Sequence, residues 1–376
     1  MSPKLSLSVF AILLVNVASA CRPGNYLAVP KHSALFVFGD SLFDAGNNHY
    51  FDTLLRFKAD HPPYGETFFG YPTGRATNGR IIPDFISEYA GLPLIPPYLQ
   101  PGQDWDYGVN FASIGGGVLD ETHPGYVINL RGQLRNFMKV EKHLRHKLGS
   151  EEAETLLSAA VYLFNIGSND YFARVQEGYN FFDWQDVQKE YVDMVVGNLT
   201  TAIQEIYNKG GRKFAFLSLS PIGYLPWVRA SDSSSTYSFV EELIEIAKQQ
   251  NRELSQVLQR LERSLKGFKH STHDFYTSLS ERSEYPSKYG FKEGEAACCG
   301  TGPYRGIFTC GKVINGYDLC EDPSDFLFFD SAHPTEKANE QFAKLFWSGD
   351  LDVTWPHNLK SLFELDSNCT SNVRRE

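Results

Sequence analysis

Three side chains that could together catalyse acyl transfer stand in short polar stretches of this sequence. Ser41 follows the apolar run 34–38, while Asp330 and His333 lie three residues apart after the apolar run 326–329. A serine hydroxyl is a weak nucleophile until an adjacent base takes its proton, and an imidazole oriented by a carboxylate can be that base. We therefore expect Ser41 as the nucleophile, His333 as the base and Asp330 as the group that orients the imidazole.

Each of these residues also has a structural alternative. Ser41 in Gly-Asp-Ser could cap a helix, and Asp330 could do the same with His333 at the surface. Ten histidines are present, and His32 and His49 flank the serine turn closely enough to compete as the base. The serine does not stand in the Gly-x-Ser-x-Gly elbow of α/β-hydrolases, which argues against that fold.

Four blocks of the sequence, taken together, carry a family resemblance. They are Phe38-Gly-Asp-Ser-Leu-Phe-Asp-Ala-Gly-Asn-Asn48, Gly108-Val-Asn-Phe-Ala-Ser-Ile-Gly-Gly-Gly117, Gly167-Ser-Asn-Asp170 and Asp330-Ser-Ala-His-Pro334. In this order they resemble the conserved blocks of the GDSL, or SGNH, hydrolases, and most closely the plant branch of esterases and lipases. The resemblance runs from about Ala34 to Trp347. It implies a carboxylic ester hydrolase that uses an acyl-serine intermediate and needs neither a cofactor nor a metal.

The resemblance also implies an oxyanion hole, the set of donors that stabilises the charge developing on the carbonyl oxygen. Its members would be the backbone N–H of Ser41, the backbone N–H of Gly115 and the side chain of Asn169. Gly116, beside Gly115, is an alternative donor, and both Gly115 and Asn169 are also common turn residues.

The remaining polar residues of the first block are Asp44, Asn47 and Asn48, and we expect them to hold its loop in shape. One departure from the plant pattern is visible, since the common run Gly-Arg-Phe-Ser-Asn-Gly appears as Gly74-Arg-Ala-Thr-Asn-Gly79. This departure could alter loop packing, but it touches no expected catalytic atom.

Two other functions share these motifs. An acyltransferase would form the same acyl-serine intermediate and pass the acyl group to an alcohol instead of water. A binding protein that has lost activity would show damage in at least one block, whereas all five expected residue types are present. The plant resemblance implies lipid or small acyl esters as substrates.

The elements that must position these residues alternate along the chain. Apolar stretches at 34–38, 107–112, 160–166, 213–219 and 267–276 are typical of strands, and 187–208, 237–265 and 335–347 have helical spacing. Alternation of strands and helices indicates a parallel sheet covered on both faces, with ligands beyond the carboxyl ends of the strands. We expect a three-layer α/β/α sandwich of the SGNH-hydrolase, flavodoxin-like type.

The ends of the chain suggest export. Lys4, the apolar stretch 5–17 and Ala18-Ser19-Ala20 predict a signal peptide over residues 1–20, which would leave one hydrolase domain at 21–376. Asn198 and Asn368 stand in glycosylation sequons, and we expect a secreted glycoprotein without an integral membrane span. Its oligomeric state is not predicted.

The number of cysteines and the net charge bear on two further questions, the presence of disulfides or a zinc site and the kind of partner. Six cysteines, four of them between 298 and 320, favour disulfides over a zinc site, with the pairing left open. The net charge of −10 disfavours nucleic acid as a partner.

Overall fold

The computed structural model describes residues 33–176, 181–231, 239–311 and 316–365. The expected signal peptide, His32, Cys21, Asn368 and Cys369 lie outside these ranges.

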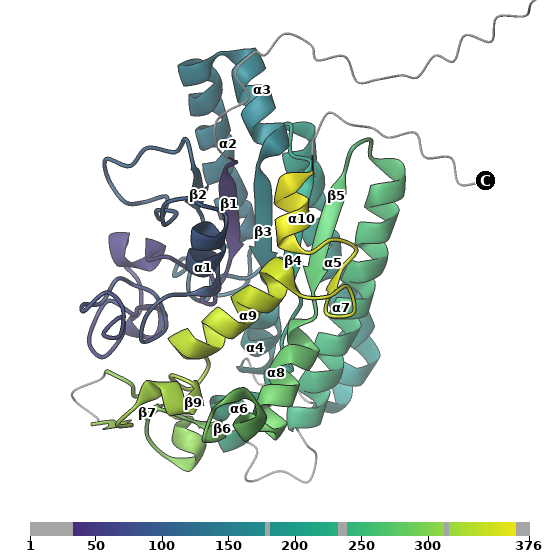
Figure 1. Cartoon of the computed structure of the whole chain (residues 1–376). Helices are drawn as coiled ribbons and strands as arrows, with labels where there is room; N and C mark the ends of the chain where they lie inside the picture. The colour runs from purple at the N-terminus through teal and green to yellow at the C-terminus, as the bar shows by residue number, and fades with distance from the viewer. Residues whose placement is uncertain (1–32, 177–180, 232–238, 312–315, 366–376) are drawn as a thin grey trace, which may run out of the picture.

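A six-stranded sheet forms the centre of the molecule (Figure 1). Its strands are β1 (Leu35–Gly39), β2 (Gly108–Asn110), β3 (Val161–Asn165), β4 (Lys213–Leu217), β5 (Lys269–His273) and β10 (Thr354–Trp355). They lie in the order β10-β5-β4-β3-β1-β2, and every pair is parallel except β10 with β5. The order 2-1-3-4-5 is flavodoxin-like. The predicted fold class and its five strands are confirmed, and the antiparallel edge strand was not predicted.

Helices cover both faces of this sheet and complete the three layers (Figure 1). On one side lie α1 (Ile82–Tyr89), α9 (Glu336–Ser348) and α10 (Leu359–Glu364), and on the other α2 (Leu130–Leu148), α5 (Phe181–Asn208) and α7 (Phe239–Ser264). Shorter helices α3 (Ser150–Ala159), α4 (Ser168–Gln176), α6 (Pro226–Ser231) and α8 (Phe275–Glu284) connect them. The helices predicted at 187–208, 237–265 and 335–347 are present as α5, α7 and α9. The first of them begins at Phe181, earlier than predicted.

Aromatic side chains on neighbouring strands bind the sheet to its helices. Phe36 stacks on Tyr162, and Tyr162 stacks on Phe214, with both pairs of ring centroids 5.4 Å apart. The ring of Phe137 from α2 meets Phe36 edge-on at 5.6 Å. All four side chains are completely buried, and such ring pairs add to the stabilisation that burial alone supplies. This packing fixes the end of β1, from which the serine turn emerges.

A second, smaller assembly lies beside the main sheet. Strands β6 (Glu293–Ala297) and β9 (Phe326–Phe328) pair in parallel, and β7 (Cys299–Gly300) pairs with β8 (Asp318–Leu319). Two disulfides, Cys298–Cys320 and Cys299–Cys310, close this region. The expected stapling of the four cysteines is confirmed. The apolar run 326–329 does form a strand, but it belongs to this satellite sheet and not to the central one.

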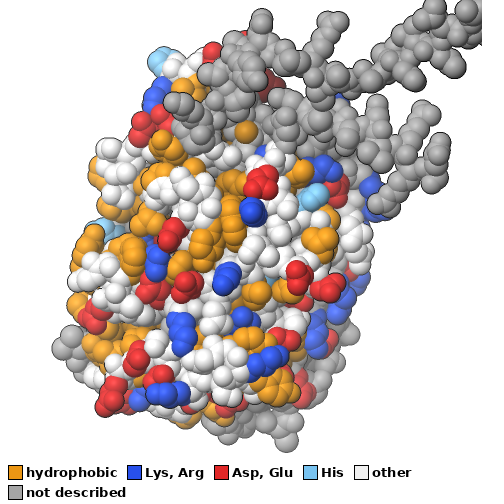
Figure 2. Space-filling view, viewed as in Figure 1, with side chains coloured by type: hydrophobic (Ala, Val, Ile, Leu, Met, Phe, Trp, Pro, Cys, Tyr) orange, Lys and Arg blue, Asp and Glu red, His pale blue; other side chains and the backbone are white. Residues whose placement is uncertain are grey.

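Short 3-10 turns occupy several of the connections: Asn47–Tyr50, Leu55–Phe57, Ile222–Tyr224, Pro286–Tyr289, Pro303–Arg305 and Pro323–Asp325. None of the described helices combines the length and apolar character that crossing a bilayer requires. On the face drawn in Figure 2, acidic and basic side chains are interspersed among hydrophobic ones, and neither sign forms a continuous field.

Candidate active site

Ser41 lies in a tight turn at the carboxyl end of β1. The amides of Phe43 and Asp44 donate to the carbonyl of Asp40 at 3.2 and 3.0 Å, and the amide of Leu42 donates to the Asp40 carboxylate at 3.1 Å. The next helical turn begins only at Asn47, so Ser41 caps no helix. The turn leaves the serine half-buried at the wall of a cavity.

This cavity, of about 260 Å³, brings most of the predicted site residues together. Ser41, Gly115, Asn169 and His333 all line it, although they come from four separate segments of the chain. Much of the remaining wall is apolar and is formed by Leu42, Phe57, Ile114, Phe172, Ile222, Leu225, Trp227, Phe275, Leu279 and Phe308. Ser41 and Asn169 follow β1 and β3, so the cavity lies beyond the carboxyl ends of these two strands. The next strand after β1 lies on one side of this pair and the next strand after β3 on the other, and sheets of this topology bind ligands at such a point. Helices α4, α6 and α8 gather around this end of the sheet, in the lower half of Figure 1.

Asp330 and His333 form a closed turn immediately after β9. The imidazole Nδ1 lies 2.8 and 2.9 Å from the two oxygens of Asp330, and the amides of Ala332 and His333 donate to Oδ1 at 2.9 Å each. The amide of Phe329 donates to the carbonyl of His333 at 2.7 Å and closes the turn. Helix α9 is capped by Thr335, so Asp330 is not its cap. The carboxylate instead fixes the ring, and Nε2 is left as the free ring nitrogen.

Asp330 and His333 stabilise each other's charged forms. Burial opposes protonation of His333, but the neighbouring Asp330 carboxylate outweighs burial, and the pKa of the imidazole is raised above its ordinary value. Burial would raise the pKa of Asp330, yet the attraction of His333 and the donated hydrogen bonds lower it below its ordinary value. The environment therefore favours an ionised Asp330 and stabilises an imidazolium when one forms.

Tyr64 is a further partner of the carboxylate that the sequence motifs do not indicate. Its hydroxyl donates to Oδ2 of Asp330 at 2.8 Å, and the ring is buried. Tyr64 lies 266 residues away from Asp330 in the chain, so no local spacing could have revealed the contact.

The two candidate oxyanion glycines differ in the structure. Gly115 lines the cavity, and its φ of 79° and the 2.6 Å approach that a Cβ would make to the Phe57 ring both demand glycine. The amide of Gly116 already donates to the carbonyl of Ser113 at 2.8 Å. Of the two residues, Gly115 lines the cavity, and no hydrogen bond from its amide is found among the described residues.

Asn169 is held in place by both neighbouring blocks. Its side-chain nitrogen Nδ2 donates to the carbonyl of Gly116 at 3.1 Å and to the carboxylate of Asp40 at 3.4 Å. Burial raises the pKa of Asp40 to about 7, although the amide of Leu42 and the charge of His333 oppose this rise. The next residue, Asp170, accepts from the amides of Val118 and Leu119 and from another side chain, Thr122. These bonds fasten the start of α4 to the glycine loop.

The other polar residues of the first block tie it to the second block. Asp44 accepts from the amides of Gly46 and Asn47 at 2.7 and 2.6 Å and from that of Ile114 at 3.0 Å. Asn47 donates to the carbonyls of Asn110 and Ala112, and Asn48 donates to those of Phe57 and Ile114. The four buried hydrogen bonds of the two asparagines and the three of Asp44 fix the loop after Ser41 in relation to Gly115.

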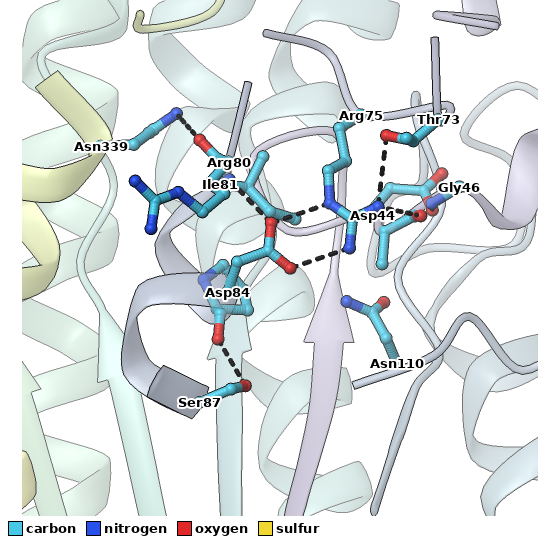
Figure 3. A network of polar contacts seen from close by, with 12 residues as sticks. Asp44, Gly46, Thr73, Arg75, Arg80, Ile81, Asp84, Ser87, Asn110 and Asn339 are labelled. Atoms are coloured by element: carbon cyan, nitrogen blue, oxygen red, sulfur yellow. Dashed lines mark hydrogen bonds and ion pairs between the residues drawn. The ribbon is translucent and has the colours of Figure 1, made fainter. Parts of the chain in front are cut away.

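The segment 74–79, where the sequence departs from the plant pattern, supports both halves of the site. Figure 3 shows the guanidinium of Arg75 between Asp84 of α1 and the loop after Ser41. It donates twice to Asp84, each time at 2.8 Å, and once to the carbonyl of Ala45 at 3.0 Å. Thr77 donates to the carbonyl of Pro334 at 2.9 Å, next to His333. The segment therefore contacts the backbone next to both candidate turns, the one with Ser41 and the one with His333, a role that the sequence alone did not reveal.

The rival histidines are placed differently. His49 pairs with Asp60 at 3.0 Å and its side chain is 54% exposed, and it does not line the cavity. His123 does line the cavity, where its Nδ1 lies 2.9 Å from the carbonyl of Gly115. No expectation from the sequence included His123, because no catalytic motif surrounds it.

Two further expectations concern sites outside the cavity. Asn198 is exposed on α5, where a glycan could be attached. In the described ranges, no group of three or more His, Cys, Asp or Glu residues is arranged to hold a metal ion.

The described residues show no hydrogen bond between the hydroxyl of Ser41 and His333, although both line the same cavity. Such a contact is often long in a substrate-free site and shortens when substrate binds. The arrangement can nonetheless place an ester carbonyl between a serine, an oriented imidazole and several N–H donors, which is the geometry of acyl transfer.

Comparisons with known proteins identify the family of the chain. Residues 35–346 match the family model described as GDSL-like lipase/acylhydrolase. "GDSL esterase/lipase 2" of Arabidopsis thaliana is 51% identical over 361 residues, covering 94% of this chain and 96% of the relative. "GDSL lipase" of Tanacetum cinerariifolium is 46% identical and covers 94% of both chains. At 36% identity, covering 92% of this chain and 78% of the relative, stands an Arabidopsis thaliana protein whose name calls it inactive, "Inactive GDSL esterase/lipase-like protein 25".

Proposed function

The chain belongs to the GDSL-like lipase/acylhydrolase family and is a carboxylic ester hydrolase, and from this premise we propose that its catalytic triad is Ser41, His333 and Asp330. The observation that carries the proposal is the shared cavity: Ser41 and His333 line it together, and Asp330 holds the imidazole from behind with both carboxylate oxygens.

The reaction begins when Nε2 of His333 accepts the proton of Ser41 as the hydroxyl oxygen attacks the ester carbonyl. The tetrahedral intermediate then collapses, and the alcohol leaves with the proton from the imidazolium. An acyl-Ser41 intermediate remains. Water, activated by the same imidazole, attacks the acyl carbon and releases the acid, which restores Ser41.

The negative charge of the tetrahedral intermediate is proposed to lie against the amides of Ser41 and Gly115 and the side chain of Asn169. Two observations support Gly115 over Gly116: Gly115 lines the cavity, and the amide of Gly116 already donates to the carbonyl of Ser113. Preorganised donors of this kind stabilise a transition state because they need no reorientation during the reaction.

The ionisation of His333 gives the proposed mechanism a definite pH dependence. The neutral imidazole is the active base, so turnover rises as pH rises through the pKa of His333. Since the Asp330 carboxylate raises that pKa above its ordinary value, the rising limb is expected on the alkaline side of a typical histidine titration.

The apolar wall is proposed to bind the acyl chain, with rings such as Phe172 and Trp227 in contact with it. Lipid and small acyl esters fit such a wall. We propose hydrolysis as the second half-reaction because the family and the named relatives are acylhydrolases, esterases and lipases. An alcohol acceptor in place of water would make the protein an acyltransferase.

We further propose that residues 21–376 form one exported hydrolase domain after removal of residues 1–20, with glycans on Asn198 and Asn368. The two disulfides support export, because structural disulfides persist in oxidising compartments.

The test is the hydrolysis of phenyl butyrate by the purified mature protein beside Ser41→Ala and His333→Ala variants, read as released phenol. Loss of either triad member is expected to lower turnover by at least about a thousandfold. Thr155→Ala, at a half-buried position on α3 that does not line the cavity, is the matched control and should hydrolyse at the wild-type rate. Variants that are folded and as active as the wild type would place the site elsewhere. Added butanol tests the second half-reaction, since a transferase would form butyl butyrate at the expense of butyrate.

A further inference from the structure

A second hollow adjoins the catalytic histidine on the side away from the oxyanion groups. It has a volume of about 40 Å³ and is lined by Leu55, Arg56, Lys58, Ala59, His61, Tyr64, Ala76, Ile114, Phe308, Cys310, Asp330, Ser331 and His333. The larger cavity shares Arg56, Ile114, Phe308 and His333 with it, whereas Ser41, Gly115 and Asn169 line only the larger one. The imidazole therefore stands between two spaces of different character.

The chemistry of the reaction assigns the two halves of an ester to these two spaces. The acyl chain follows the carbonyl carbon that Ser41 attacks, and the apolar wall of the larger cavity suits it. The alcohol oxygen must lie against His333, because it leaves with the proton carried by the imidazole. A substituent on the alcohol portion consequently extends toward the smaller hollow.

Basic side chains dominate the charge of that smaller hollow. Arg56 lines it, and its guanidinium lies 4.7 Å from the centre of the Phe57 ring without an ion-pair partner among the described residues. Lys58 lies 3.7 Å from Asp60, whose carboxylate is also 3.0 Å from His49. The one acid in the lining is Asp330, and its charge is directed at His333. Arg56 is exposed and has no ion-pair partner in the described part of the chain, and Lys58 is only partly balanced by Asp60, so the hollow has a net positive charge near His333.

From this juxtaposition we propose that the physiological ester carries an anionic group, a carboxylate or a phosphate, on its alcohol portion, and that Arg56 and Lys58 bind it beside His333. The inference rests on the proposed function and adds the class of alcohol to it. A hollow of about 40 Å³ is small and suits one such group better than a long chain. The planar guanidinium offers paired donors to either anion.

The experiment compares four butyrate esters of one geometry. They are phenyl butyrate and its 3-carboxy, 3-phosphonooxy and 3-trimethylammonio derivatives, and kcat/KM of each is divided by its rate of hydroxide-catalysed hydrolysis to remove intrinsic reactivity. The better anionic ester is expected to exceed the cationic ester by at least about tenfold at low ionic strength, and the preference should shrink as salt screens the charges. Whichever anion gives the larger value identifies the source of the charge.

Variants identify the side chains that cause the preference for anionic esters. Arg56→Gln is expected to lower the ratio of the anionic to the cationic ester by about fivefold, and Arg56→Gln with Lys58→Gln by about tenfold or more. Arg131→Gln is the matched control, because Arg131 is exposed, pairs with Asp120 and lines neither hollow, and it should leave the ratio at the wild-type value.

The outcomes separate this inference from the proposed function. Equal values for the anionic and cationic esters, or a preference that survives the double substitution, would overturn the inference while hydrolysis of phenyl butyrate still supports the triad. If none of the four esters is hydrolysed, the proposed triad is rejected. The affinities of the esters for the Ser41→Ala variant are then compared by calorimetry. Tighter binding of an anionic ester that depends on Arg56 then supports the inference on its own, and equal binding rejects it.

Discussion

The two halves of the proposed catalytic site follow strands of two different sheets. Ser41 follows β1, which is paired on both sides, with β3 and β2, in the six-stranded sheet, and its loop is fixed by buried bonds from Asp44, Asn47 and Asn48. Asp330 and His333 follow β9, which among the described strands pairs with β6 in a two-stranded satellite sheet next to two disulfides. The proposed nucleophile thus belongs to the core of the fold, whereas the proposed base belongs to a smaller sheet that disulfides help to hold.

This difference indicates how each half can fail. The serine side has many interlocking hydrogen bonds and an aromatic core behind it, so a local change there endangers the whole fold. The histidine side depends on fewer supports, among them Tyr64, Thr77 and the disulfides. We expect that side to lose its geometry first, while the central sheet stays folded.

The largest effect is expected from Asp330→Asn, which keeps the shape of the side chain but removes the charge that orients and stabilises the imidazole. Turnover should fall by about a thousandfold to ten-thousandfold, as when a triad carboxylate is neutralised elsewhere. Ester hydrolysis at saturating substrate measures it. Tyr64→Phe, which removes only one donor to the same carboxylate, is the matched comparison and should cost less than about tenfold. If both variants lose the same activity, the charge of Asp330 is not what matters.

Removal of the Cys298–Cys320 link is expected to weaken the smaller sheet. Cys298→Ala with Cys320→Ala should lower the free energy of unfolding of this region by about 2–4 kcal/mol. The link spans 22 residues, against 11 for Cys299–Cys310, so the corresponding change at the shorter link should cost less. Heat inactivation and far-UV circular dichroism, followed together, test the account. Activity should be lost at a lower temperature than helical structure, and coincident losses would show that the two halves unfold as one.

Acid is expected to lower the stability of the central sheet through His273 of β5. Burial lowers the pKa of His273 to about 3, and its ring packs on Phe346 of α9. The unfolded chain binds a proton at this residue below its ordinary pKa of about 6.5 while the folded chain does not, so stability is full above that value and falls as pH decreases toward 3. Between pH 8 and pH 5 the loss from His273 should be about 2 kcal/mol. Urea unfolding at both pH values measures it, and His273→Gln should flatten the dependence. An unchanged dependence in that variant would refute the assignment.

The smallest effect is expected at Thr77, whose hydroxyl meets the carbonyl of Pro334 beside His333. Thr77→Val should leave that buried carbonyl without its donor, at a cost of about 1–3 kcal/mol in stability, together with a modest fall in kcat at unchanged KM. Thr77→Ser keeps the hydroxyl and should restore kcat. Failure of the serine variant to do so would show that packing, and not the hydrogen bond, is the function of the side chain.

The sequence predicted the serine side better than the histidine side. Strand patterns near 34–38, 107–112 and 160–166 are local, and each ends in a polar block, so their convergence at one edge followed from the rules of parallel sheets. The order of the strands, the antiparallel β10 and the membership of β9 in a separate sheet depend on pairing between distant residues, which periodicity does not encode. The disulfide pairing was open for the same reason.

Contacts between distant segments also explain which supporting residues were missed. Tyr64, Arg75 and Thr77 lie within fifteen residues of one another in a stretch with few regular elements, yet they serve Asp330, Asp84 and Pro334, respectively. Arg75 and Thr77 stand in the run 74–79 that departs from the plant pattern, whereas Tyr64 had no signal in the sequence. His123, beside Gly115 in the cavity, had no signal of this kind.

The most direct test of the central claim is to trap the nucleophile. The mature protein is treated with an aryl phosphonate ester that reacts with activated serines, then digested, and the labelled peptide is sequenced by mass spectrometry. The account predicts one phosphonyl group per chain, on Ser41, with labelling slowed by at least about a hundredfold in His333→Ala because the base is gone. A label on another residue of the active protein, or equal labelling of Ser41 without His333, would contradict it.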